Sequence, residues 1–94
     1  LLFTRNGIMN IKNEKWKNDF SVLDPDGTSF VDSFYSKAYL RHLAHSQELL
    51  AAQIATLHNL GFYLWLVGEA RDQIIAGTFY EWKNKMVKQM ANRL

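Results

Sequence analysis

The sequence predicts a mainly α-helical fold that begins with a short β-hairpin. Two β-prone runs, residues 1–4 and 8–11, stand close together at the start of the chain. From residue 36 to the end, apolar residues recur at the three- and four-residue spacing of amphipathic helices. The length of 94 residues restricts the chain to one small domain or part of one, because such a chain buries only about 60–65 % of its unfolded surface.

The first expected element is the β-hairpin. Arg5-Asn6-Gly7 separates the two runs, and Asn-Gly between apolar runs is a strong hairpin signal because both residues tolerate positive φ. A lone two-stranded hairpin is only marginally stable in water. We therefore expect it to pack against other elements.

A turn-rich loop follows the hairpin. Residues 12–23 are mixed in character, with Trp16, Phe20 and Leu23 as apolar anchors. Residues 24–27 read Asp-Pro-Asp-Gly, in which proline presets φ for a turn and Asp-Gly continues it. This run is the clearest loop signal in the chain.

Helical signals begin at Ser36, which we expect to be the N-cap of the first helix, with Tyr39, Leu40 and Leu43 along one apolar stripe. Ser46 is the expected cap of the second helix. There Glu48 would lie in the first turn, where the helix dipole favours an acid.

The apolar stripe of the second helix resumes past Asn59 and Gly61, which we interpret as a bend or break. Gly77 is the expected C-terminal stop of that helix. Residues 78–81, Thr-Phe-Tyr-Glu, predict a capping box that begins the last helix. Its apolar face carries Phe79, Trp82, Met86 and Met90.

Composition narrows the class of protein. Hydrophobic residues make up 48 % of the chain, which is too rich for intrinsic disorder. There is no cysteine, so disulfides and thiolate metal sites are excluded. We find no signal peptide and no apolar run of about 20 residues, which predicts a soluble protein without a membrane partner. The chain also begins without Met, and we expect it to be part of a longer protein.

Catalytic motifs are missing. The sequence has no Gly-rich phosphate loop, no nucleophile elbow and no His-Glu-x-x-His. His42, His45 and His58 lack the further ligands of a zinc site, so we interpret them as ordinary histidines. The aromatic residues exceed what so small a core encloses, and some should contact either the remainder of the same polypeptide or a second subunit. From the residues alone the chain is a small helical interaction module.

Six stretches of the chain carry a more specific pattern: residues 2–4, 7–13, 19–21, 23–25, 35–43 and 58–63. The most telling are Asn-Ile-Lys-Asn at 10–13, Ser-Lys-Ala-Tyr-Leu-Arg-His-Leu at 36–43 and His-Asn-Leu-Gly-Phe-Tyr at 58–63. Together, nearly end to end, they resemble the tail of the bacterial tRNA-guanine transglycosylases, or queuine tRNA-ribosyltransferases.

That resemblance implies the C-terminal part, the tail subdomain and last helices, of a (β/α)8 TIM-barrel enzyme of the cytoplasm. Such an enzyme exchanges guanine at the tRNA wobble position for a 7-deazaguanine precursor of queuosine through a covalent aspartate intermediate. The catalytic aspartates would lie upstream, so the segment itself is not expected to be catalytic. Residues 1–35 would form the hairpin and loop of a zinc-type subdomain. Residues 36–94 would include the last barrel helix and the terminal helix, in one structural unit.

The resemblance also implies where a metal would lie. The family's zinc ligands, Cys-x-Cys-x-x-Cys and a later His, correspond here to Gly27, Ser29, Asp32 and His58. Only the histidine remains, and one imidazole cannot hold zinc by itself. We therefore expect no metal and no other cofactor. The loop should instead be stabilised by turn chemistry at residues 25–27 and by hydrogen bonds from Ser29 and Asp32. Packing of the aromatic residues Phe30 and Phe34 should stabilise it further. His58 would be an N-terminal helix residue kept for hydrogen bonding.

Two partners are implied in the same way. The family's homodimer interface uses an aromatic and histidine cluster that matches Tyr35, Tyr39 and His42. The basic residues near the start become candidate tRNA-backbone contacts, because phosphate binding needs positive charge but little sequence detail; they are Lys12, Lys15 and Lys17. The alternative is a free-standing helical protein-interaction module descended from that tail.

Overall fold

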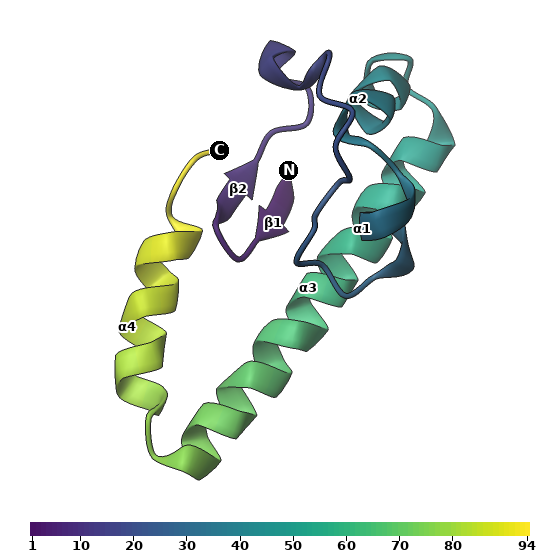
Figure 1. Cartoon of the computed structure of the whole chain (residues 1–94). Coiled ribbons are helices and arrows are strands. Elements are labelled where there is room, and N and C mark those ends of the chain that lie inside the picture. Colours follow the sequence, from purple (N-terminus) through teal and green to yellow (C-terminus); the bar gives the residue numbers. More distant parts are fainter.

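The computed structural model describes all 94 residues as an elongated, mainly helical molecule of 46 × 22 × 19 Å. Its elements, in order, are β1 (Leu2–Thr4), β2 (Gly7–Met9), the short 3-10 helix η1 (Glu14–Trp16), α1 (Phe30–Phe34), α2 (Lys37–His45), α3 (Leu49–Ala76) and α4 (Phe79–Met90). Helix α3 runs the length of the molecule, α1 and α2 lie along its first half, and α4 returns beside the hairpin (Figure 1). The mainly helical prediction with an N-terminal hairpin is confirmed.

The hairpin closes with Thr4 opposite Gly7. Of Asn6 and Gly7 only Gly7 has a positive φ, at 149°. The Thr4 hydroxyl closes the turn instead: it accepts from the Asn6 N–H at 3.2 Å and donates to the Gly7 carbonyl at 2.8 Å. Gly7 must be glycine for a second reason, since a Cβ there would lie 2.4 Å from the carbonyl oxygen of Asn92.

Both edges of the hairpin are covered by later parts of the chain. On β2, the Ile8 N–H donates to Asn92 O at 2.8 Å, and the Leu94 N–H donates to Ile8 O at 2.9 Å. On β1, the Phe3 N–H donates to the Asn59 side chain of α3 at 3.0 Å. An uncovered strand edge is a site of unwanted pairing, so these bonds let a two-stranded sheet persist.

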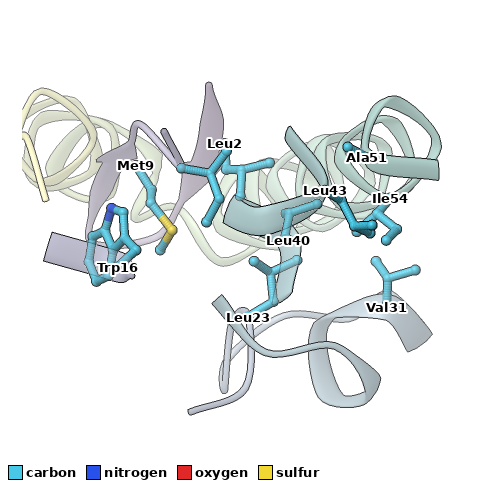
Figure 2. Close-up of a cluster of buried hydrophobic side chains, with 10 residues drawn as sticks. Leu2, Met9, Trp16, Leu23, Val31, Leu40, Leu43, Ala51 and Ile54 are labelled. Atoms are coloured by element: carbon cyan, nitrogen blue, oxygen red, sulfur yellow. The ribbon is translucent and has the colours of Figure 1, made fainter. Parts of the chain in front are cut away.

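Figure 2 shows the hydrophobic core, a cluster of 10 buried residues. It draws side chains from the hairpin, the loop, α1, α2 and the first turns of α3: Leu2, Met9, Ile11, Trp16, Leu23, Val31, Leu40, Leu43, Ala51 and Ile54. Only 18 of the 94 residues are buried. The second half of α3 and most of α4 therefore expose much of their apolar surface.

Helix α2 begins as predicted. The Ser36 hydroxyl caps it by accepting from the Tyr39 N–H at 3.1 Å. Its buried face is formed by Ala38, Leu40 and Leu43, whereas Tyr39 is 44 % exposed. The predicted stripe is therefore wrong at Tyr39, because this side chain points away from the core.

Helix α3 is a single uninterrupted helix of 28 residues, so the bend expected at Asn59 and Gly61 is wrong. The Asn59 side chain instead binds the hairpin backbone, donating to Leu1 O at 3.1 Å. Gly61 lies against Ser29, and a Cβ at position 61 would be 3.0 Å from the Ser29 Cβ. Contacts with the hairpin explain Asn59, and contact with Ser29 explains Gly61. Close packing at Gly61 offsets the roughly 1 kcal/mol that a glycine costs inside a helix.

The helix ends follow the sequence signals in part. Gly77 ends α3 in the left-handed conformation, with φ 76°, as predicted. Ser46 ends α2, and the N-cap of α3 is Glu48, so the expected Ser46 cap is wrong. The capping box expected at residues 78–81 is wrong: Thr78 precedes α4 but forms no capping bond, because its hydroxyl contacts the Gln73 side chain. The apolar face of α4 is as predicted, with Met86 buried and the other three residues half-buried.

The short helix α1 has no counterpart in the sequence prediction. Phe30 and Phe34, at its two ends, are 67 % and 74 % exposed. The expectation that their packing stabilises the loop is therefore wrong. Val31 and Asp32, both 1 % exposed, take the buried positions instead.

By length and composition alone, α3 could cross a membrane, with a mean hydropathy of 1.2 over an 18-residue window that is 17 % buried. The expectation that no segment reaches this length is wrong. A single helix of this kind is weak evidence for a membrane span, because helices of soluble proteins can reach the same length and hydropathy.

Candidate functional site

A buried carboxylate–imidazole pair joins three distant parts of the chain. Asp32 of α1 and His58 of α3 are each 1 % exposed, and Nδ1 of His58 is hydrogen-bonded to Oδ1 of Asp32. On the other side of the ring, Nε2 lies 2.8 Å from the carbonyl oxygen of Phe3 in β1. Because a carbonyl oxygen only accepts, Nε2 carries a hydrogen, and one further hydrogen is shared between Nδ1 and the carboxylate. The prediction that His58 is kept for hydrogen bonding is confirmed, but it lies well inside α3 and not at its start.

The second oxygen of Asp32 organises the loop. Oδ2 accepts from the Ser29 N–H at 3.1 Å, just before α1 begins, and Asp32 O accepts from the Asp24 N–H at 3.2 Å. The predicted loop bonds involving Ser29 and Asp32 are therefore present. Asp32 links the start of α1, the turn at 24–27 and α3.

Asp24 is the third ionisable residue here. Its Oδ1 accepts from the Asp26 N–H at 3.1 Å, which shapes the turn as predicted. Burial raises the pKa of the Asp24 carboxyl above its ordinary value, while the bond from Asp26 and the nearby His58 oppose that rise. The sequence did not single out Asp24 as a neighbour of His58.

The arrangement fits a metal poorly. Asp24, Asp32 and His58 offer ligand atoms within 4.8 Å of one another. However, both ring nitrogens of His58 and both carboxylate oxygens of Asp32 already make hydrogen bonds. Gly27 supplies no ligand atom, and the set has no thiolate. Structural zinc sites use four cysteine or histidine ligands, so these residues do not form one.

No substrate pocket opens onto the pair. The Arg5 guanidinium stacks on the Trp65 ring, 3.9 Å from its centre. Both side chains line a cavity of about 10 Å³ that also borders Asp24 and His58. A volume of this size holds one water molecule at most. We conclude that the pair is enclosed within this segment and links its parts.

An aromatic cluster, formed by Phe34, Tyr35 and Tyr39, lies at the junction of α1 and α2. The rings of Tyr35 and Tyr39 are stacked, with centres 5.8 Å apart and planes 6° apart, and Phe34 meets Tyr35 edge-on at 4.8 Å. His42 is exposed one turn after Tyr39. The structure thus brings Tyr35 and Tyr39 together at the surface.

An apolar groove of about 490 Å³ adjoins this aromatic cluster. It lies between α1 and the start of α3, and Tyr35 forms part of its wall. Its other apolar lining includes Phe30, Leu50 and Leu57, all of which are exposed. The aromatic cluster and the groove form a continuous apolar surface.

The basic residues near the start of the chain are all exposed, on the segment around η1: Lys12, Lys15 and Lys17. Helix α2 holds this segment in place. Arg41 Nε donates to Asn13 O at 3.2 Å, and His45 Nε2 lies 3.2 Å from Lys12 O. The structure thus places Arg41 and His45 beside the segment that carries the three lysines, and we call these five residues the basic surface. The sequence did not reveal them because they lie 28 and 33 residues from their partners.

Comparison with known proteins gives one consistent result. A family model described as "Queuine tRNA-ribosyltransferase" matches residues 1–92. Proteins of that name are similar to the chain, among them those of Aquifex aeolicus, 42 % identical over 93 residues, and Helicobacter pylori, 40 % identical over 92. These alignments cover 99 % and 98 % of the chain but 25 % of each relative. The protein of Neisseria meningitidis is 44 % identical over 82 residues, 87 % of the chain and 22 % of the relative. The chain thus spans about a quarter of the length of these relatives.

Proposed function

The chain belongs to the queuine tRNA-ribosyltransferase family, and from this we propose that it is the C-terminal segment of a tRNA-guanine transglycosylase. The match across residues 1–92 carries this proposal. The whole enzyme would exchange the wobble guanine of tRNA for a 7-deazaguanine precursor of queuosine in the cytoplasm. The segment would supply dimerisation and tRNA support, while the catalytic aspartates would lie outside it.

Exposed apolar surface supports a larger polypeptide around the segment. Leu60, Leu64 and Val67 on α3, and Ile74 and Ile75 near its end, are each about half exposed or more. Large apolar patches of this kind are rare on free monomers. In the proposed enzyme, a (β/α)8 barrel covers them, and residues 36–94 include the last barrel helix and the terminal helix.

The aromatic cluster supports a homodimer. Tyrosine is favoured at interface hot spots because it brings a large contact area at little entropic cost and keeps a polar tip. Tyr35 and Tyr39 are already stacked on each other, so little further ordering is needed when a second subunit binds. His42 would lie at the edge of the same contact.

The basic surface supports tRNA binding. Lys12, Lys15 and Lys17 are exposed, and Arg41 and His45 lie beside them through their bonds to the same segment. Lysines and an arginine from two elements can follow a phosphate backbone without reading bases. These lysines would position the tRNA, while other parts of the enzyme would recognise it.

Reversing two of these charges tests the tRNA role. In the full-length enzyme that carries this segment, Lys12→Glu with Lys15→Glu should weaken tRNA binding at moderate salt by about tenfold or more. The plot of log affinity against log salt should become shallower by roughly one to two units, because about one counterion is released per phosphate contact. Filter binding over a salt series measures both effects.

The matched control is Lys85→Glu with Lys88→Glu on α4, which changes the net charge equally. This control should retain most of the affinity. If the two double variants lose affinity equally, or if neither does, the proposed tRNA contact is wrong.

A further inference from the structure

The hydrogen bonds among Phe3, Asp32 and His58 connect distant segments of the chain, as a structural metal ion does. The two bonds of the His58 ring join positions 26 and 55 residues apart in the sequence. The His58 imidazole alone therefore holds both the loop and the hairpin on α3. Structural metals stabilise small domains by joining distant segments in this way.

These hydrogen bonds leave no free ring nitrogen for a cation. Each ring nitrogen of His58 and each carboxylate oxygen of Asp32 has a hydrogen-bond partner. A metal on His58 would have to displace Asp32 or Phe3 from the ring. The displaced polar group would then be buried without a partner, which is costly in a site that is 1 % exposed.

Gly27 shows that the loop is built around the Asp32 carboxylate. A Cβ at position 27 would lie 2.1 Å from Oδ2, 2.3 Å from Cγ and 2.6 Å from Cβ of Asp32. The φ of Gly27 is not in the left-handed region, so its backbone does not demand glycine. The residue is glycine because the Asp32 side chain fills the space that a side chain at position 27 would need.

We propose that in this chain Gly27, Asp32 and His58 form one interdependent clasp that takes the structural place of the family's metal. The Asp32 carboxylate occupies the space that the side chain of the first ligand, at position 27, would need. Its bond to His58 replaces the cross-link that a metal would make. A side chain at position 27 would overlap the Asp32 side chain, so the two do not fit together in this fold. This inference concerns the chain's own stability and does not depend on the proposed dimer or tRNA contact.

A double-mutant cycle tests the exclusion. Gly27→Ala should lower the folding equilibrium constant by about tenfold or more, because its methyl group collides with Asp32. In an Asp32→Gly background the same substitution meets none of those atoms and should change the constant by less than about threefold. Such non-additivity is the signature of residues in contact. Urea unfolding measures all four proteins, with a stabilising osmolyte added equally to each.

The matched control is Gly68→Ala, because a Cβ at this helical position meets nothing within 4 Å. It should be neutral or stabilising. Equal losses for Gly27→Ala in the two backgrounds would overturn the proposal.

A second measurement needs no destabilised variant. In the wild-type chain, NMR should detect a hydrogen on Nε2 of His58 and a second hydrogen shared between Nδ1 and the Asp32 carboxylate, shifted downfield and protected from solvent exchange. His42 and His45, which are exposed, serve as internal controls and should exchange rapidly. The absence of this shared hydrogen, or its loss when Zn²⁺ is added at one equivalent, would overturn the clasp.

Discussion

His58→Ala is expected to lower the free energy of unfolding by about 2–6 kcal/mol, because each of two buried polar groups left without a partner costs roughly 1–3 kcal/mol. The substitution leaves the Asp32 carboxylate and the Phe3 carbonyl buried without their ring partners. Domains of this size have roughly 5–15 kcal/mol of total stability. The variant should therefore lose much of its stability, as measured by urea unfolding followed by circular dichroism.

The control for this prediction is His45→Ala. The His45 ring also bonds a backbone carbonyl, but at an exposed position, where the loss should be about 1 kcal/mol or less. Similar losses for the two variants would show that the buried pair contributes no more than a surface hydrogen bond.

Tyr39→Ala is expected to weaken the proposed dimer by roughly 30-fold or more, since an interface hot-spot residue contributes about 2 kcal/mol or more. Folding should be little changed, because Tyr39 is 44 % exposed and lies outside the core. Light scattering over a concentration series gives the dissociation constants. Tyr80→Ala on α4, which removes a 73 % exposed tyrosine, is the matched control and should leave the dimer intact.

The dimer prediction has two contrary outcomes. A wild-type chain that stays monomeric at every concentration would mean that the aromatic cluster packs on another part of the enzyme. Equal weakening by Tyr39→Ala and Tyr80→Ala would show that the contact does not centre on α2.

Local signals in the sequence were sufficient for part of the fold. The hairpin, the Ser36 cap, the Gly77 stop and the apolar face of α4 each depend on residues close together in the chain. Such signals act through backbone conformation and helical periodicity, which neighbouring residues largely determine.

The remaining features depend on contacts between distant residues. Asn59 resembles a helix breaker until its bonds to Leu1 and Phe3, more than 50 residues away, are known. Tyr39 matched the apolar stripe, but only the packing of Leu40 shows which side of α2 faces the core. Tertiary contacts override local preference in both cases.

The candidate site likewise combines residues that the sequence indicated with contacts that only the structure shows. The resemblance drew attention to Gly27, Asp32 and His58 as former ligand positions, but the sequence did not show that the last two bond to each other. Nor did it show that the Asp32 carboxylate fills the space beside Gly27. Spacing along a chain does not reveal which side chains share a volume.

In the proposed clasp, this member of the family holds its loop on α3 through Asp32 and His58 and not through a metal. The most direct test is the metal content of the purified 94-residue chain, together with its thermal unfolding before and after treatment with a chelator. We expect far less than one zinc ion per chain and an unchanged melting temperature. Stoichiometric zinc, with a melting temperature that falls when the chelator is added, would contradict the claim.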